Sequence, residues 1–153
     1  MPDDGCCWSR TVPPCYCHVM SSSSAIVSPV TAITPVIDAH EPSEFQTWLA
    51  EQQEEAAEPG DSLAQKGQQI FTEQCVSCHA IQGLTESPRN VGPDLTHFAS
   101  RETFAGAMFP LNEDNLAAWI EDPRAVKPGA LMPDYNLSQE EIDAVVEYLM
   151  GLE

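Results

Sequence analysis

The sequence predicts a small all-α domain of three to four helices over residues 62–153. Apolar residues recur there at helical spacing in three segments, the last of which opens with a helix-capping pattern. Proline- and glycine-rich loops separate the segments, at residues 87–93 and 123–133. Because a short helical domain with long loops buries a modest core, we expect a prosthetic group to fill its centre.

The chain before this domain divides into three parts. Residues 1–35 contain four of the six cysteines, a run of four serines and no sustained period. We expect them to be poorly ordered, with a false start or a shifted reading frame as the alternative explanation. Residues 36–50 predict the end of a strand and then a helical turn, and residues 51–61, which are acidic and end in a Pro-Gly pair, predict a linker.

Each predicted helix has one apolar face. Within the domain, the first helix follows Ser62, the second begins at Asn112 or Glu113, and the last opens with the capping box of residues 138–141. The apolar faces consist of Phe45, Trp48 and Leu49 in the N-terminal turn, Leu63, Gly67, Ile70 and Phe71 in the first helix, Leu116, Trp119 and Ile120 in the second, and Ile142, Val145, Val146, Leu149 and Leu152 in the last.

The charge balance narrows the possible partners. Six Lys and Arg against 24 Asp and Glu leave a formal charge of −18, which disfavours nucleic acid and anionic membrane surfaces and favours a basic protein partner. Good solubility or adaptation to a salty medium explains the charge equally well. No apolar run of about 18 residues is present to span a bilayer, and the first residues lack the features of a secretory signal. We therefore expect any membrane anchor to lie outside this sequence.

The pentapeptide from Cys75 to His79, CVSCH, carries the chemistry. On a helical turn, the thiols of Cys75 and Cys78 are spaced to bond both vinyl groups of one haem, and His79 then lies under the iron as an axial ligand. A thiol–disulfide redox pair is an alternative, but the βαβ setting typical of such a pair is absent. Half of a zinc site is another, but a second ligand pair at suitable spacing is absent downstream.

A six-coordinate haem needs a second axial ligand, and three residues are candidates. We favour Met132, in the loop of residues 128–133, because Pro133 restricts the preceding backbone there. Met108 is the second candidate and is equally compatible with a core side chain at a helix end. His97 is the third, with a surface or propionate-side position as its alternative. Methionine ligation would raise the reduction potential relative to bis-histidine ligation.

Five stretches within residues 62–153 carry a family resemblance: Gly67-x-x-x-Phe71, CVSCHAIQG, NVGPDLTHFASR, NLAAWIEDPRAVKPGALMPDYNLS and VVEYLMGL. Through them the domain resembles a class I cytochrome c. More narrowly, it is similar to the domain fused to the C-terminus of subunit II in some bacterial cytochrome c oxidases. The resemblance implies a small cytochrome c fold around one covalent haem c.

The resemblance also implies roles for individual residues. Cys75 and Cys78 would form the thioether bonds, and His79 and Met132 would be the axial iron ligands. Pro93 would offer its carbonyl to the other nitrogen of His79 and so fix the orientation of the ring. The first and last helices would cross at Gly67, with Phe71 and Tyr148 packing at the crossing.

Four further side chains are weaker candidates for the haem environment. An indole donor at Trp119, or a cation at Arg124 or Lys127, would neutralise a buried propionate. A core position is equally compatible with Trp119, and solvation is the favoured interpretation for the two cations. Tyr135 is compatible with either core or haem-edge packing.

Residues 36–52, with the phrase EFQTWL, are similar to the end of the cupredoxin domain of oxidase subunit II. That family carries a binuclear copper motif, Cys-x-x-x-Cys-x-x-x-His-x-x-Met. Residues 15–20 read CYCHVM instead, so the ligand spacing is wrong. We predict no copper binding by this chain. A longer native subunit II, with membrane helices and a copper site upstream, is the hypothesis that explains the unusual N-terminus.

These features predict electron transfer on the periplasmic side of the cell membrane. As an oxidase module, the domain would accept an electron from a cytochrome or quinol-side donor and pass it to CuA, in contact with the other oxidase subunits. A stand-alone carrier, or a haem module of another complex, is the alternative. The chain itself would break no substrate bond, because a six-coordinate haem has no open position for substrate.

Overall fold

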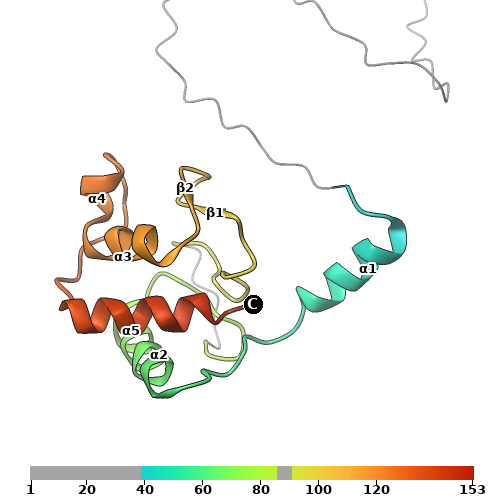
Figure 1. Cartoon of the computed structure of the whole chain (residues 1–153), viewed down its shortest axis with the longest axis horizontal. Coiled ribbons are helices and arrows are strands. Elements are labelled where there is room, and N and C mark those ends of the chain that lie inside the picture. Colours follow the sequence, from blue (N-terminus) through green and yellow to red (C-terminus); the bar gives the residue numbers. More distant parts are fainter. Residues whose placement is uncertain (1–38, 86–90) are drawn as a thin grey trace, which may run out of the picture. The chain divides into compact units, whose positions relative to one another are not determined.

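The structure, a computed structural model, describes residues 39–85 and 91–153. Residues 1–35, which we expect to be poorly ordered, lie outside this part of the chain. The described elements are α1 (Pro42–Glu51), α2 (Ser62–Gln74), β1 (Thr103–Phe104), β2 (Phe109–Pro110), α3 (Glu113–Glu121), α4 (Pro123–Val126) and α5 (Gln139–Met150) (Figure 1). The predicted all-α class is confirmed, with a minimal hairpin added to it.

Helices α2 and α5 form the centre of the domain and cross at Gly67. Asp61 caps α2, because its carboxylate accepts the backbone N–H groups of Leu63 and Ala64, both at 2.8 Å. A Cβ atom at Gly67 would collide with the backbone carbonyl of Ala144 in α5. Glycine therefore permits the close approach of the two helices, as the sequence predicts.

Buried side chains of α5 supply much of the core. The helix starts at the predicted capping box, where the Glu141 carboxylate accepts both the backbone N–H and the hydroxyl of Ser138 at 2.8 Å. These two hydrogen bonds hold the pKa of Glu141 below its usual value. Tyr148 meets Phe71 of α2 edge to face, with ring centroids 5.8 Å apart. The buried residues of the helix are Ile142, Ala144, Val145, Val146, Tyr148 and Leu149.

The hairpin β1–β2 packs against α3 through aromatic rings. The strands pair antiparallel, with Phe104 opposite Phe109. Trp119 of α3 lies 6.0 Å from Phe104 and 6.3 Å from Phe109, measured between ring centroids. Asn112 caps α3 by accepting the backbone N–H of Asn115 at 2.9 Å. The hairpin is thus anchored to the helical core at its base.

The segment before the domain forms the helix α1 and then a linker, part of which is hydrogen-bonded to the domain. In α1, the rings of Phe45 and Trp48 lie 5.6 Å apart, measured between centroids, and both side chains are largely exposed. Farther along, the Ala56 N–H donates to the Gln82 carbonyl at 3.1 Å, and the Gln82 amide donates to the Gln53 carbonyl at 3.2 Å. Part of the predicted linker is therefore fastened to the loop that follows His79.

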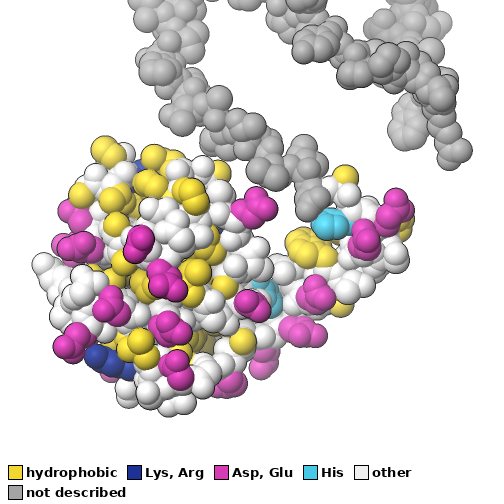
Figure 2. Space-filling model, viewed as in Figure 1, with side chains coloured by type: hydrophobic (Ala, Val, Ile, Leu, Met, Phe, Trp, Pro, Cys, Tyr) yellow, Lys and Arg dark blue, Asp and Glu magenta, His cyan; other side chains and the backbone are white. Residues whose placement is uncertain are grey.

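The surface is strongly acidic. Figure 2 shows Asp and Glu side chains spread over the visible face, with exposed hydrophobic side chains between them. Among the described residues, no helix combines the length and the apolar character needed to cross a bilayer.

Candidate functional site

The Cys-x-x-Cys-His pentapeptide forms a tight turn at the end of α2. Cys75 is the C-cap residue and donates its backbone N–H to Phe71 at 2.8 Å. The backbone N–H groups of Cys78 and His79 both donate to the Cys75 carbonyl at 3.0 Å. These bonds place both thiols and the imidazole on one turn, and both cysteines are half-buried free thiols.

The environment of Cys75 differs from that of a redox-active cysteine. Burial, with a smaller effect from Cys78, raises the pKa of Cys75 to about 11. Cysteines of thiol–disulfide oxidoreductases have lowered pKa values instead, because the thiolate is their nucleophile. The apolar setting suits a sulfur atom that is to become part of a thioether.

His79 is held by the loop that follows. Its Nδ1 atom lies 2.9 Å from the Pro93 carbonyl oxygen. A carbonyl only accepts, so Nδ1 carries a hydrogen, and in the neutral ring Nε2 is then the nitrogen whose lone pair can bind a metal. The contact expected from Pro93 is therefore present, and it fixes the tautomer and the ring plane together.

Gly92, which the sequence did not single out, also lies against the His79 ring. Gly92 and Pro93 together form a backbone clamp on this histidine. Its backbone N–H donates to the Cys78 carbonyl at 2.8 Å, and a Cβ atom there would lie 2.7 Å from Cε1 of His79. The loop therefore lies against the imidazole ring as closely as a backbone can. The signal in the sequence was a glycine directly before Pro93.

The three candidates for the second axial ligand have different surroundings. Met132 lies half-buried in the loop between α4 and α5, next to Leu131, which is 93% exposed. The loop therefore turns the methionine inward and the leucine outward. Met108 lies in the hairpin turn and is 47% exposed. Of the two methionines, Met132 is the less exposed residue.

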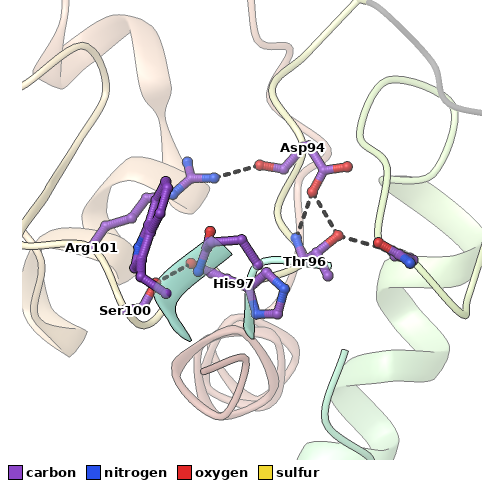
Figure 3. A pocket seen from close by; sticks show the side chains of 8 residues that line it. Asp94, Thr96, His97, Ser100 and Arg101 are labelled. Atoms are coloured by element: carbon purple, nitrogen blue, oxygen red, sulfur yellow. Dashed lines mark hydrogen bonds between the residues drawn. The ribbon is translucent and has the colours of Figure 1, made fainter. Parts of the chain in front are cut away.

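His97 is engaged elsewhere, beside a pocket of about 460 Å³. Its Nδ1 atom lies 3.0 Å from the Glu153 carbonyl oxygen, and its Nε2 atom is buried without a hydrogen-bond partner. Figure 3 shows the neighbouring network, in which Asp94 accepts from Thr96 and Arg101. This network orders the loop after Pro93.

The four weaker candidates for the haem environment differ in their burial and contacts. Trp119 is half-buried in the aromatic cluster of the hairpin, and Tyr135 is half-buried in the Met132 loop. Arg124 is exposed, which agrees with solvation. Lys127 differs from the favoured interpretation, because its ammonium group donates to the Ala105 carbonyl at 2.6 Å.

The donor set fits a covalently attached haem better than a zinc ion. Two free thiols and an imidazole with an available Nε2 share one turn, and a protected thioether lies in a separate loop. Within residues 39–85 and 91–153, no three His, Cys, Asp or Glu side chains gather as a metal-binding cluster. The copper-like residues 15–20 lie outside the described chain.

A helical domain with a histidine-terminated thiol turn and a backbone clamp on that histidine defines a class of haem-carrying electron-transfer proteins. Residues 64–153 match the cytochrome c family, and the chain belongs to that family. Membership implies covalently bound haem c. The domain is thus a cytochrome c electron-transfer domain, as the sequence predicts.

Several curated relatives are longer than this chain. It is 39% identical over 116 residues to cytochrome c oxidase subunit 2 of Alkalihalophilus pseudofirmus, covering 74% of this chain and 33% of that protein. It is 36% identical over 115 residues to the Bacillus subtilis subunit 2, covering 71% and 32%. The chain therefore spans about a third of the length of these relatives. Cytochrome c of Tetrahymena pyriformis is 31% identical over 100 residues, covering 61% of this chain and 90% of that protein.

Proposed function

We propose that this chain is the cytochrome c module of a cytochrome c oxidase subunit 2 and passes electrons toward CuA. The observation that carries its electron-transfer role is the clamp on His79, which leaves Nε2 facing away from Pro93 and free to coordinate iron. The oxidase context is supported by the extent of the similarity to subunit 2. That similarity covers 74% of the chain, more than residues 64–153 do, and so includes residues before the haem domain.

Each site residue has a defined task in this proposal. Cys75 and Cys78 would hold one haem c through thioether bonds, and His79 and Met132 would be the ligands of its iron. Pro93 fixes the His79 ring, and Trp119 contributes to the haem environment. When bound, haem c supplies the one-electron chemistry. With His79 and Met132 both bound to the iron, no position would be open to a substrate.

The proposed partners follow from the oxidase context. A soluble cytochrome or a quinol-side component donates the electron, and the other oxidase subunits receive it and provide contact with the membrane. The site of action is the periplasmic side of the cell membrane, because thioether attachment takes place outside the cytoplasm. The charge of −18 favours a donor with a basic surface and disfavours nucleic acid.

A stand-alone electron carrier is the second candidate. The similarity to the Tetrahymena cytochrome c, which covers 90% of that protein, favours it. Affinity purification of the tagged chain from membranes solubilised in mild detergent discriminates between the two. Recovery of the oxidase catalytic subunit supports the module, whereas recovery of the haem protein alone from the soluble fraction supports the carrier.

Haem attachment itself is tested on a denaturing gel. The chain is expressed with export and haem-attachment machinery, and the gel is stained for haem. We expect the stain to migrate with the polypeptide and to disappear in the double variant Cys75→Ala, Cys78→Ala. A polypeptide that carries no stain while both thiols react with an alkylating reagent would contradict the proposal.

A further inference from the structure

We propose that Lys127 is a positioning residue for Met132. Its ammonium group fastens the loop that carries Met132 to the turn of the β1–β2 hairpin, and this tether keeps the thioether on the haem iron. The inference rests on the proposed role of Met132 as an axial ligand. It assigns a task to a lysine that the sequence alone favours as a solvated cation.

The tether is a single short contact between distant parts of the chain. Nζ of Lys127 donates to the carbonyl oxygen of Ala105 at 2.6 Å, across 22 positions of sequence. The lysine is half-buried, so this charge-assisted hydrogen bond is partly shielded from water. A Cβ atom at Gly106 would lie 3.3 Å from Nζ, so the absence of a side chain there leaves room for the ammonium group.

The hairpin turn that contains Ala105, the acceptor of this hydrogen bond, has an unfavourable backbone conformation. Ala105, Gly106 and Ala107 have φ values of 53°, 77° and 60°, so three successive residues are left-handed. Two of them are alanines, for which this conformation is unfavourable and persists only where surrounding contacts impose it. The Lys127 contact is one such constraint, and the aromatic base of the hairpin is another.

The backbone of Lys127 is also held by two hydrogen bonds. Its backbone N–H donates to the Pro123 carbonyl at 3.0 Å at the end of α4, and its carbonyl accepts the Ala130 N–H at 3.0 Å. These bonds join α4 to the first turn of the Met132 loop. A restraint on the lysine side chain is therefore transmitted to the backbone that carries the thioether five positions later.

Loss of the tether should weaken the methionine ligand without removing it. A loop with more conformational freedom loses more entropy when its methionine binds iron, so an external ligand competes more easily for the sixth position. The loss of one hydrogen bond to a charged group corresponds to about a tenfold change in such an equilibrium.

The experiment uses the ferric holoprotein and compares Lys127→Met, Lys127→Arg and Arg124→Met. Arg124→Met is the matched control, because it removes one positive charge at an exposed position of α4, the short helix that Lys127 directly follows. The readouts are the sulfur–iron absorption band, the dissociation constant of added imidazole and the reduction potential. We expect Lys127→Met to bind imidazole about tenfold more tightly, Lys127→Arg to lie closer to the unmodified protein, and Arg124→Met to leave the constant unchanged.

Three results would overturn the proposal: an unchanged imidazole constant in Lys127→Met, an equal change in Arg124→Met, or a lower potential with no change in ligand affinity. The last result would indicate a charge effect at the haem. If Lys127→Met does not fold, Gly106→Ala disturbs the same contact from the opposite side and must tighten imidazole binding likewise. An unmodified protein that lacks the sulfur–iron band would instead refute the Met132 assignment itself, which separates the two failures.

Discussion

At the scale of single residues, two positions next to the turn of residues 75–79 would determine how an iron is held in the proposed haem site. Gly92 lies against one edge of the His79 ring, and Pro93 accepts its Nδ1–H. A side chain at the first position and a displaced carbonyl at the second would both rotate the imidazole. The orientation of the His79 ring, the proposed proximal ligand, therefore depends on the backbone atoms of Gly92 and Pro93.

Gly92→Ala is expected to destabilise the holoprotein by about 1–3 kcal/mol, because the new methyl group overlaps the imidazole and the loop must shift. Urea unfolding followed by haem absorbance measures the change. Gly60→Ala is the control, since no atom lies within 4 Å of a Cβ at that position. Equal stabilities of the two variants would show that the loop does not press on His79.

Met132→Ala is expected to open the sixth coordination position and to lower the reduction potential, because the thioether ligand favours the ferrous state. Redox titration and the sulfur–iron absorption band check both effects. Met108→Ala, at an exposed methionine, should leave the potential and the band unaltered. The reverse pattern would reassign the ligand to Met108, and no change in either variant would indicate His97.

At the scale of elements, the crossing of α2 and α5 determines whether the turn of residues 75–79, the proposed haem-binding turn, has a rigid base. Cys75 directly follows α2, so any displacement of this helix moves the thiols and His79 with it. The crossing depends on the absence of a side chain at Gly67, and Phe71 and Tyr148 fill the space beside it.

Gly67→Ala is expected to cost about 3 kcal/mol, the upper part of the range for an overpacked core, because the added methyl group meets backbone that cannot rotate away. Thermal unfolding monitored by circular dichroism measures the loss. Gly151→Ala serves as the control, since a Cβ there would lie 3.5 Å from its nearest neighbour. A melting temperature for Gly67→Ala equal to that of the control would contradict the close crossing.

The start of α5 predicts a pH dependence. The pKa of Glu141 is lowered in the folded state by its hydrogen bonds to Ser138, so its contribution to stability is present above the unfolded pKa near 4.5. It is lost as the pH falls through the folded pKa. We expect Glu141→Gln to melt below the unmodified protein at pH 7 and the two melting temperatures to converge as the pH falls through the lowered pKa of Glu141. A difference that persists in acid would assign the effect to packing.

The elements differ in how well local sequence predicts them. The three larger helices of the domain and the cysteine turn depend on caps, apolar periodicity and a contiguous motif, so their signals lie within a few residues. The hairpin was missed because its strands have two residues each and its turn contains Ala105 and Ala107 where Asn or Gly is usual. The contact of Lys127 with Ala105 depends on tertiary structure, and no local pattern indicates it.

At the scale of the whole molecule, the excess of acidic groups should govern encounters with redox partners. A charge of −18 attracts cations over distances that salt shortens to about 8 Å at 0.15 M. We expect oxidation by a small cationic metal complex to slow by about tenfold between low ionic strength and 0.15 M, whereas oxidation by an anionic complex should accelerate. Stopped-flow measurement of both rates is the test. Rates that are independent of salt would leave solubility as the role of the charge.

The hydrogen bonds between residues 53–56 and Gln82 bear on the kinetics of electron delivery. They hold residues 53–56 against the loop just beyond His79, a few residues from the proposed haem-binding turn. A redox centre joined to the chain before these residues would encounter the haem as an intramolecular neighbour, at an effective concentration in the millimolar range. Electron exchange between two such centres would be first order, and its rate would not depend on the protein concentration.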